Sequence, residues 1–150
     1  MEPMLKSAAP QAAPPADLVK DSDQTKFAKD VLEASRTVPV IVDFWAPWCG
    51  PCRAFAPIFE AATGRHPDVV FGKVDTEAEP GLAAAFDVRA IPTLAVLRDG
   101  ILLGAFPGML PGAKLDELIG KVRELDMDEV RRSLDEASPA EPRPAKAEVA

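Results

Sequence analysis

Both cysteines of this 150-residue chain lie in one stretch, FWAPWCGPCRAFAPIF (residues 44–59), and only two residues separate them. Such a pair could bind a metal, form a structural disulfide or act in redox chemistry. Structural zinc normally takes four protein ligands, whereas this chain offers two cysteines, a single histidine (His66) and no second CxxC motif. The stabilisation that a disulfide gives shrinks with the loop that it closes, and this loop is short. The pair therefore favours a redox centre, and we expect no metal.

The redox interpretation depends on where a helix begins. If a helix begins near Gly50, Cys49 lies at the N-terminus of that helix, where unpaired N–H groups and the helix dipole stabilise a thiolate. Pro51 fits the first turn of such a helix, because the N–H that it lacks is not needed there. Cys52 follows at the i, i+3 spacing, with Cβ atoms about 5–6 Å apart in a regular helix against about 3.5–4.5 Å in a relaxed disulfide. We therefore predict Cys49 as the nucleophile and a bond to Cys52 that can form and break.

Predicted strands and helices alternate along the chain. Residues 38–46 (VPVIVDFWA) form a near-continuous apolar run, which is typical of a strand covered on both faces. The other predicted strands are one over 68–75 and a hairpin over 92–106 that turns at Asp99-Gly100. The predicted helices cover 22–35, with Ser22 or Asp23 as the N-cap, a segment from Gly50, a short segment opened by Glu79-Pro80, and a segment from Pro111 to about Val122. Residues 127–137 extend the last helix or form a further helical turn. This order predicts an α/β fold with a mixed sheet and helices on both faces.

Composition limits the number of domains and the kinds of partner. A chain of this length with 47% hydrophobic residues can build one core. Its net charge of −7 disfavours nucleic acid and anionic membranes as partners. The N-terminus carries no apolar signal core, and no apolar run reaches the length of a membrane span, so we expect a cytoplasmic monomer. We expect a disordered Pro/Ala-rich arm (1–16), a domain (17–125), a helical extension (126–137) and a disordered tail (138–150).

Longer stretches around the cysteines carry a resemblance. VDFWAPWCGPCRAFAPIF (42–59), GKVDTEAEPGLAAAFDVRAIPTLAVLRDG (72–100) and Gly108 resemble the thioredoxin family, over roughly residues 17–123. The resemblance implies a central mixed five-stranded sheet flanked by about four helices. It also implies a general protein-disulfide reductase, in which Cys49 attacks the substrate disulfide and Cys52 resolves the mixed disulfide.

Two further residues take their roles from the resemblance. Asp43 is similar to the buried carboxyl that helps move the proton of Cys52, and Lys73 to the lysine that approaches this acid from the neighbouring strand. An acid within an apolar strand is desolvated, which raises its pKa into the range useful for proton transfer. The alternatives are that Asp43 faces solvent and that Lys73 is a solvated strand end.

The resemblance also implies a substrate-binding rim. Pro92 is similar to a cis-proline opposite the disulfide, and Ile91 would offer its backbone to an extended substrate. The implied substrate-binding residues are Trp48, Gly50, Pro51, Ile91, Pro92 and Gly108. Trp48 could instead be a core aromatic. Among the remaining residues we expect Trp45 to pack beneath the active-site loop and three others to lie on the surface: Arg53, Arg89 and His66.

Cofactor and partners follow from the same resemblance. It implies no bound cofactor, protein disulfides as substrates, and a thioredoxin reductase-like flavoprotein that draws on NADPH and returns the electrons. One alternative is a binding or chaperone module whose cysteines are incidental. Another is an isomerase or oxidase, because the sequence gives no reduction potential.

Overall fold

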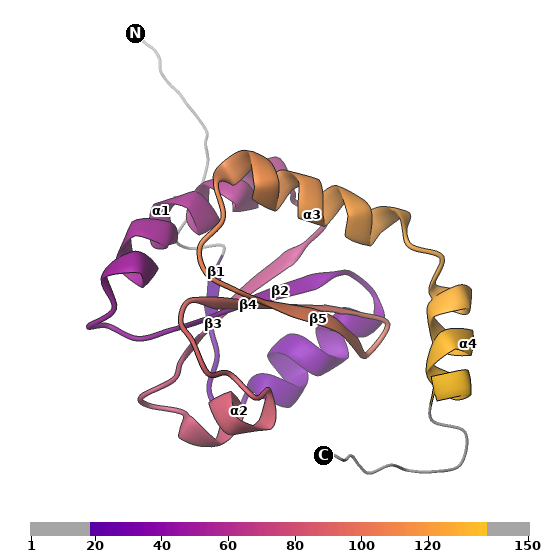
Figure 1. Ribbon diagram of the computed structural model, residues 1–150, viewed down its shortest axis with the longest axis horizontal. Coiled ribbons are helices and arrows are strands. Elements are labelled where there is room, and N and C mark those ends of the chain that lie inside the picture. Colours follow the sequence, from indigo (N-terminus) through magenta and orange to yellow (C-terminus); the bar gives the residue numbers. More distant parts are fainter. Residues whose placement is uncertain (1–18, 138–150) are drawn as a thin grey trace, which may run out of the picture.

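The computed structural model describes residues 19–137, so the expectations for the N-terminal arm (1–16) and the C-terminal tail (138–150) lie outside the described residues. The strands are β1 (Val19–Asp21), β2 (Val40–Trp45), β3 (Val70–Asp75), β4 (Thr93–Arg98) and β5 (Ile101–Pro107). The helices are the π-helical η3 (Ala28–Glu33), the 3-10 segment η4 (Ala34–Arg36), α1 (Gly50–Arg65), α2 (Pro80–Ala85), α3 (Gly112–Glu124) and α4 (Met127–Ala137). Figure 1 shows how these elements surround the sheet.

The sheet is mixed and has five strands, as predicted. Its order is β1-β3-β2-β4-β5; β1, β3 and β2 run parallel, while β4 is antiparallel to both β2 and β5. The hairpin turns where expected: Asp99 and Gly100 have φ of 56° and 76°, the two positive values that a type I′ turn requires. The three-residue strand β1 has no strand pattern of its own, and only the resemblance indicated it.

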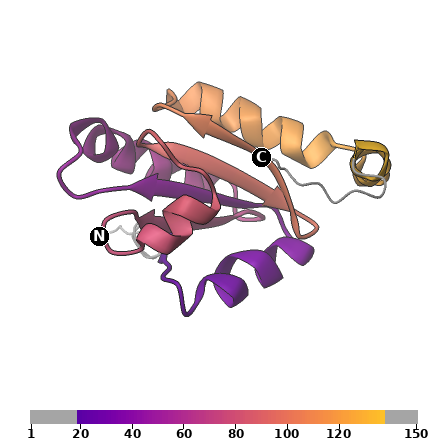
Figure 2. The ribbon, with the colours of Figure 1, turned by 60° about the horizontal axis from the view of Figure 1, so that its bottom comes forward.

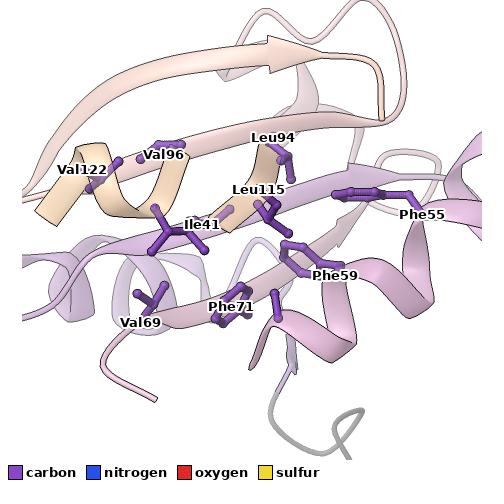
Figure 3. Close-up of a cluster of buried hydrophobic side chains, with 11 residues drawn as sticks. Ile41, Phe55, Phe59, Val69, Phe71, Leu94, Val96, Leu115 and Val122 are labelled. Carbon is purple, nitrogen blue, oxygen red and sulfur yellow. The ribbon is translucent and has the colours of Figure 1, made fainter. Parts of the chain in front are cut away.

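Helices cover both faces of the sheet. α1 and α3 pack on one face, and α2 with η3 and η4 on the other, as Figure 2 shows from a second side. Because side chains of a strand alternate, Ile41 points to the first face and Val40 and Val42 to the second. Figure 3 shows the larger cluster, beneath α1 and α3, which contains Ile41, Phe55, Phe59, Ala62, Val69, Phe71, Leu94, Val96, Leu115, Ile119 and Val122.

The first and last helical regions, residues 22–36 and 127–137, differ from a single regular helix and from an extension of α3. Asp23 does not cap a regular α-helix; its carboxylate accepts hydrogen bonds from the N–H groups of Thr25 and Lys26 and closes a turn, after which η3 and η4 follow. Residues 127–137 form a separate helix, α4. The Asp126 carboxylate accepts hydrogen bonds at the start of α4, and Arg131 joins the helix to Asp99 of the hairpin at 2.9 Å.

The expectation that His66 lies on the surface is wrong. His66 ends α1 and is only 8% exposed. Its Nδ1 lies 2.7 Å from a guanidinium nitrogen of Arg123, and its Nε2 lies 2.7 Å from Asp116 of α3. Because a guanidinium can only donate, Nδ1 accepts and Nε2–H donates to Asp116. The same guanidinium binds Asp68, and these hydrogen bonds lower the pKa of Asp68 to about 2. The imidazole thus joins α1 to α3.

We predict that His66→Ala lowers the free energy of unfolding by about 1–2 kcal/mol, because two side-chain hydrogen bonds between α1 and α3 are lost. Urea denaturation would measure the change. The matched control is Arg89→Ala, which removes an exposed ion pair with Asp87 and should cost less than about 0.5 kcal/mol. Equal losses in the two variants would contradict the structural role of His66.

Candidate active site

The two cysteines lie at the N-terminus of α1 and are joined by a disulfide, with their Cα atoms 5.2 Å apart. Cys49 is the N-cap of α1, and its backbone is extended, with φ of −84° and ψ of 113°. The N–H of Cys52 donates to the Cys49 sulfur at 3.2 Å. The sulfur of Cys49 therefore takes the place that an N-cap oxygen usually has, against N–H groups that have no partner within the helix. This geometry favours negative charge on that sulfur.

Both cysteines are nearly covered. Cys49 is 4% exposed and Cys52 is 2% exposed, and they form a small cluster with Ala46 against which Trp45 and Ile91 pack. Trp45 therefore lies beneath the active-site loop, as expected. Of the two cysteines, Cys49 is the slightly more exposed one.

The rim comes from three loops. The Ile91-Pro92 bond is cis, as predicted, and the Ile91 carbonyl oxygen lies 3.9 Å from the Cys49 sulfur. Gly108, with φ of 92°, donates its N–H to the Pro92 carbonyl at 2.8 Å, which fixes the loop after β5 beside the loop before β4. Trp48 is 63% exposed and is therefore no core aromatic. Gly50 and Pro51 are exposed in the first turn of α1.

Asp43 is fully buried in the middle of β2, so it does not face solvent. Neither carboxylate oxygen accepts a hydrogen bond from the described residues. Burial raises the pKa of Asp43 to about 7, and the charge of Lys73 opposes this shift. Lys73 is the residue directly opposite Asp43 in the parallel pair β2–β3. Its ammonium lies 4.4 Å from the centre of the Trp45 ring.

Two contacts near the cysteines each include a residue for which the sequence predicted no site role, Glu77 in one and Arg53 in the other. The Trp48 indole N–H donates to a carboxylate oxygen of Glu77 at 2.5 Å, and the Arg53 guanidinium donates to the Pro47 carbonyl at 3.0 Å. Glu77 lies within the TEAE segment that formed part of the resemblance, but nothing in the local pattern indicated its partner. The catalytic and substrate-binding roles carried over from the family stay predictions for every residue named above.

No metal site accompanies these residues: between residues 19 and 137, no three His, Cys, Asp or Glu side chains are grouped to hold an ion. The helices in that part of the chain are also too short or too polar to cross a membrane.

A buried disulfide at a helix N-terminus, beside the loop of a cis-proline, is typical of thiol–disulfide oxidoreductases. The family model described as Thioredoxin matches residues 18–121. The chain belongs to the thioredoxin family, and it is a protein-disulfide oxidoreductase that needs no bound cofactor.

Similar proteins agree with this assignment. The chain is 55% identical over 97 residues to "Putative thioredoxin 2" of Streptomyces coelicolor, which covers 65% of this chain and 72% of that protein. It is 41% identical over 96 residues to "Thioredoxin 1" of Synechococcus elongatus, covering 63% and 88% of the two chains. The X-ray structure of Fasciola hepatica thioredoxin matches with a TM-score of 0.63 and 33% identity, over 68% of this chain and 97% of that chain.

We predict that the stability of the disulfide form falls with rising pH because of Asp43. The unfolded carboxyl ionises near 3.8 and the folded one near 7, so the folded state holds the extra proton in this window. The free energy of unfolding therefore decreases by up to about 4 kcal/mol between about pH 4 and about pH 7, and it levels off at higher pH. Urea denaturation of the wild type and of Asp43→Asn across this range would measure the difference, since other groups titrate in both proteins. Parallel curves would contradict the raised pKa.

Proposed function

We propose that this protein is a general reductase of protein disulfides, and that a separate flavoprotein reductase drawing on NADPH restores its dithiol. The observation that carries the proposal is the hydrogen bond from the Cys52 N–H to the Cys49 sulfur at the start of α1. The same N–H can stabilise a Cys49 thiolate once the disulfide is reduced, which makes that sulfur both the better nucleophile and the better leaving group near neutral pH.

The reaction then has two exchange steps. The Cys49 thiolate attacks one sulfur of the substrate disulfide, and the other substrate sulfur leaves as a thiolate and takes up a proton. The Cys52 thiol gives up its proton and attacks the Cys49 sulfur of the mixed disulfide, which releases the second substrate thiol. Two electrons pass to the substrate, and the Cys49–Cys52 disulfide is the product form of the protein.

In this scheme Asp43 accepts the proton of Cys52. A carboxyl with a pKa of about 7 is partly ionised at neutral pH and can both take and return a proton. The neighbouring Lys73 favours the ionised form, and so keeps the carboxyl usable in spite of its burial. A pure binding module would have no use for a buried carboxyl that accepts no hydrogen bond from residues 19–137, and this favours the reductase over a chaperone role.

The proposal also covers the domain that carries the activity, the oligomeric state and the location in the cell. We place the activity in the domain of residues 17–125, acting as a monomer in the cytoplasm, with residues 126–137 as a helical extension. The net charge of −7 disfavours nucleic acid and anionic membranes as partners in this setting.

The first test is insulin reduction with dithiothreitol as the electron donor. Wild-type protein should accelerate it, and Cys49→Ser should abolish the acceleration because the attacking thiolate is gone. Cys52→Ser should form a mixed disulfide with the substrate and fail to release it, which mass spectrometry would detect. Activity that survives in Cys49→Ser would exclude this nucleophile. Equal binding of unfolded proteins by the wild type and a double Cys→Ser variant, without any reductase activity, would favour the chaperone module.

A second prediction concerns Asp43→Asn, which removes the proton acceptor while keeping the size of the side chain. Release of substrate from the mixed disulfide should slow by about tenfold or more at neutral pH. The wild-type release rate should rise with pH through about 7, and the variant should lack that inflection. Stopped-flow measurement of the release step from pH 5 to pH 9 would show it. Identical pH profiles would remove Asp43 from the mechanism.

A further inference from the structure

The most exposed aromatic ring beside the disulfide has a carboxylate bound to its edge. Trp48 directly precedes Cys49, and 63% of its surface is open. Its indole N–H donates to Oε2 of Glu77 at 2.5 Å. A tryptophan on an active-site rim would otherwise be free to change its orientation, whereas this hydrogen bond fixes the ring and leaves its surface available.

The loop that carries Glu77 is itself held in place. The backbone N–H and the hydroxyl of Thr76 both donate to the Trp45 carbonyl, at 2.8 and 3.0 Å. Asp75 accepts a hydrogen bond from the N–H of Glu77 at 2.9 Å and closes the turn. The carboxylate is therefore presented by an ordered turn that is tied to the end of β2, immediately before the active-site loop.

The segment that carries Glu77 is acidic. Asp75 ends β3, and Glu77 and Glu79 follow within the next four residues. Two cations of this region have partners other than Glu77: the Lys73 ammonium lies over Trp45, and the Arg53 guanidinium donates to the Pro47 carbonyl. Oε1 of Glu77 accepts no hydrogen bond from residues 19–137 and can take a second donor.

An open indole face with a carboxylate at its edge is suited to a basic side chain. A guanidinium or ammonium group is attracted to the face of the ring, and the carboxylate pairs with its charge. We propose that Trp48 and Glu77 form a subsite for an arginine or lysine of the protein substrate, next to the disulfide under attack. The enzyme then prefers disulfides flanked by basic residues over those flanked by acidic ones. This inference rests on the reductase activity proposed above.

Two disulfide-bonded peptides that differ only in an Arg or a Glu beside one cysteine would test the subsite. Wild-type protein should reduce the Arg peptide with about three- to tenfold higher kcat/KM at low ionic strength, mainly through KM. The preference should shrink as salt is added. Glu77→Gln keeps an oxygen for the indole N–H but removes the charge, so the preference should fall to near one. Glu77→Lys should reverse it, and the exposed-site control Glu124→Gln on α3 should keep it.

The outcomes separate this inference from the proposed function. A wild type that reduces insulin but treats the two peptides alike would overturn the subsite and leave the reductase intact. An unchanged preference in Glu77→Gln would overturn it as well. If Glu77→Gln lowers kcat/KM equally for both peptides, Glu77 acts only by holding Trp48, and the basic subsite is rejected. Failure of the wild type to reduce insulin would count against the reductase itself.

Discussion

The proposed reaction depends on one requirement: the Cys49 sulfur, which is nearly buried, must still carry charge. Removing Cys49 from water disfavours its thiolate, and only groups fixed in the protein can compensate. The start of α1 supplies them, because the Cys52 N–H points at the sulfur and has no partner within the helix. That position exists only if β2 ends at Trp45 and α1 begins at Gly50, so the lengths of these two elements decide whether the chemistry is possible.

Asp43, in strand β2, presents the same conflict between burial and charge. The rest of β2 is apolar and covered on both faces, so a carboxyl there lowers stability whenever it is ionised. Its two oxygens accept no hydrogen bond from the described residues, and Lys73 gives only a charge on the neighbouring strand. A residue that opposes folding in this way supports the proton-transfer role proposed for Asp43. The aromatic and aliphatic cluster beneath α1 and α3 supplies the stability that the site lacks.

Local patterns were enough to predict much of this structure. The apolar run of β2, the Asp99-Gly100 turn and the start of α1 all depend on residues that are close in sequence. The missed features depend on distant partners. His66 is buried because Asp116 and Arg123, 50 and 57 residues away, surround it, and Glu77 meets Trp48 across 29 residues. Neither partner can be inferred from the residues around it, and a three-residue strand such as β1 has too few positions to show a period.

The meeting of Trp48 and Glu77 nevertheless follows from the topology. β2 and β3 run parallel, and Trp45 at the end of one pairs with Asp75 at the end of the other. Parallel strands place their carboxyl ends at the same edge of a sheet, so the segments that follow them emerge side by side. Trp48 comes three residues after Trp45, and Glu77 two residues after Asp75. The cysteines therefore follow one strand and the carboxylate that borders them follows the next. In the proposed scheme, substrate preference can therefore change in the loop after β3 without any change at the start of α1, which holds Cys49.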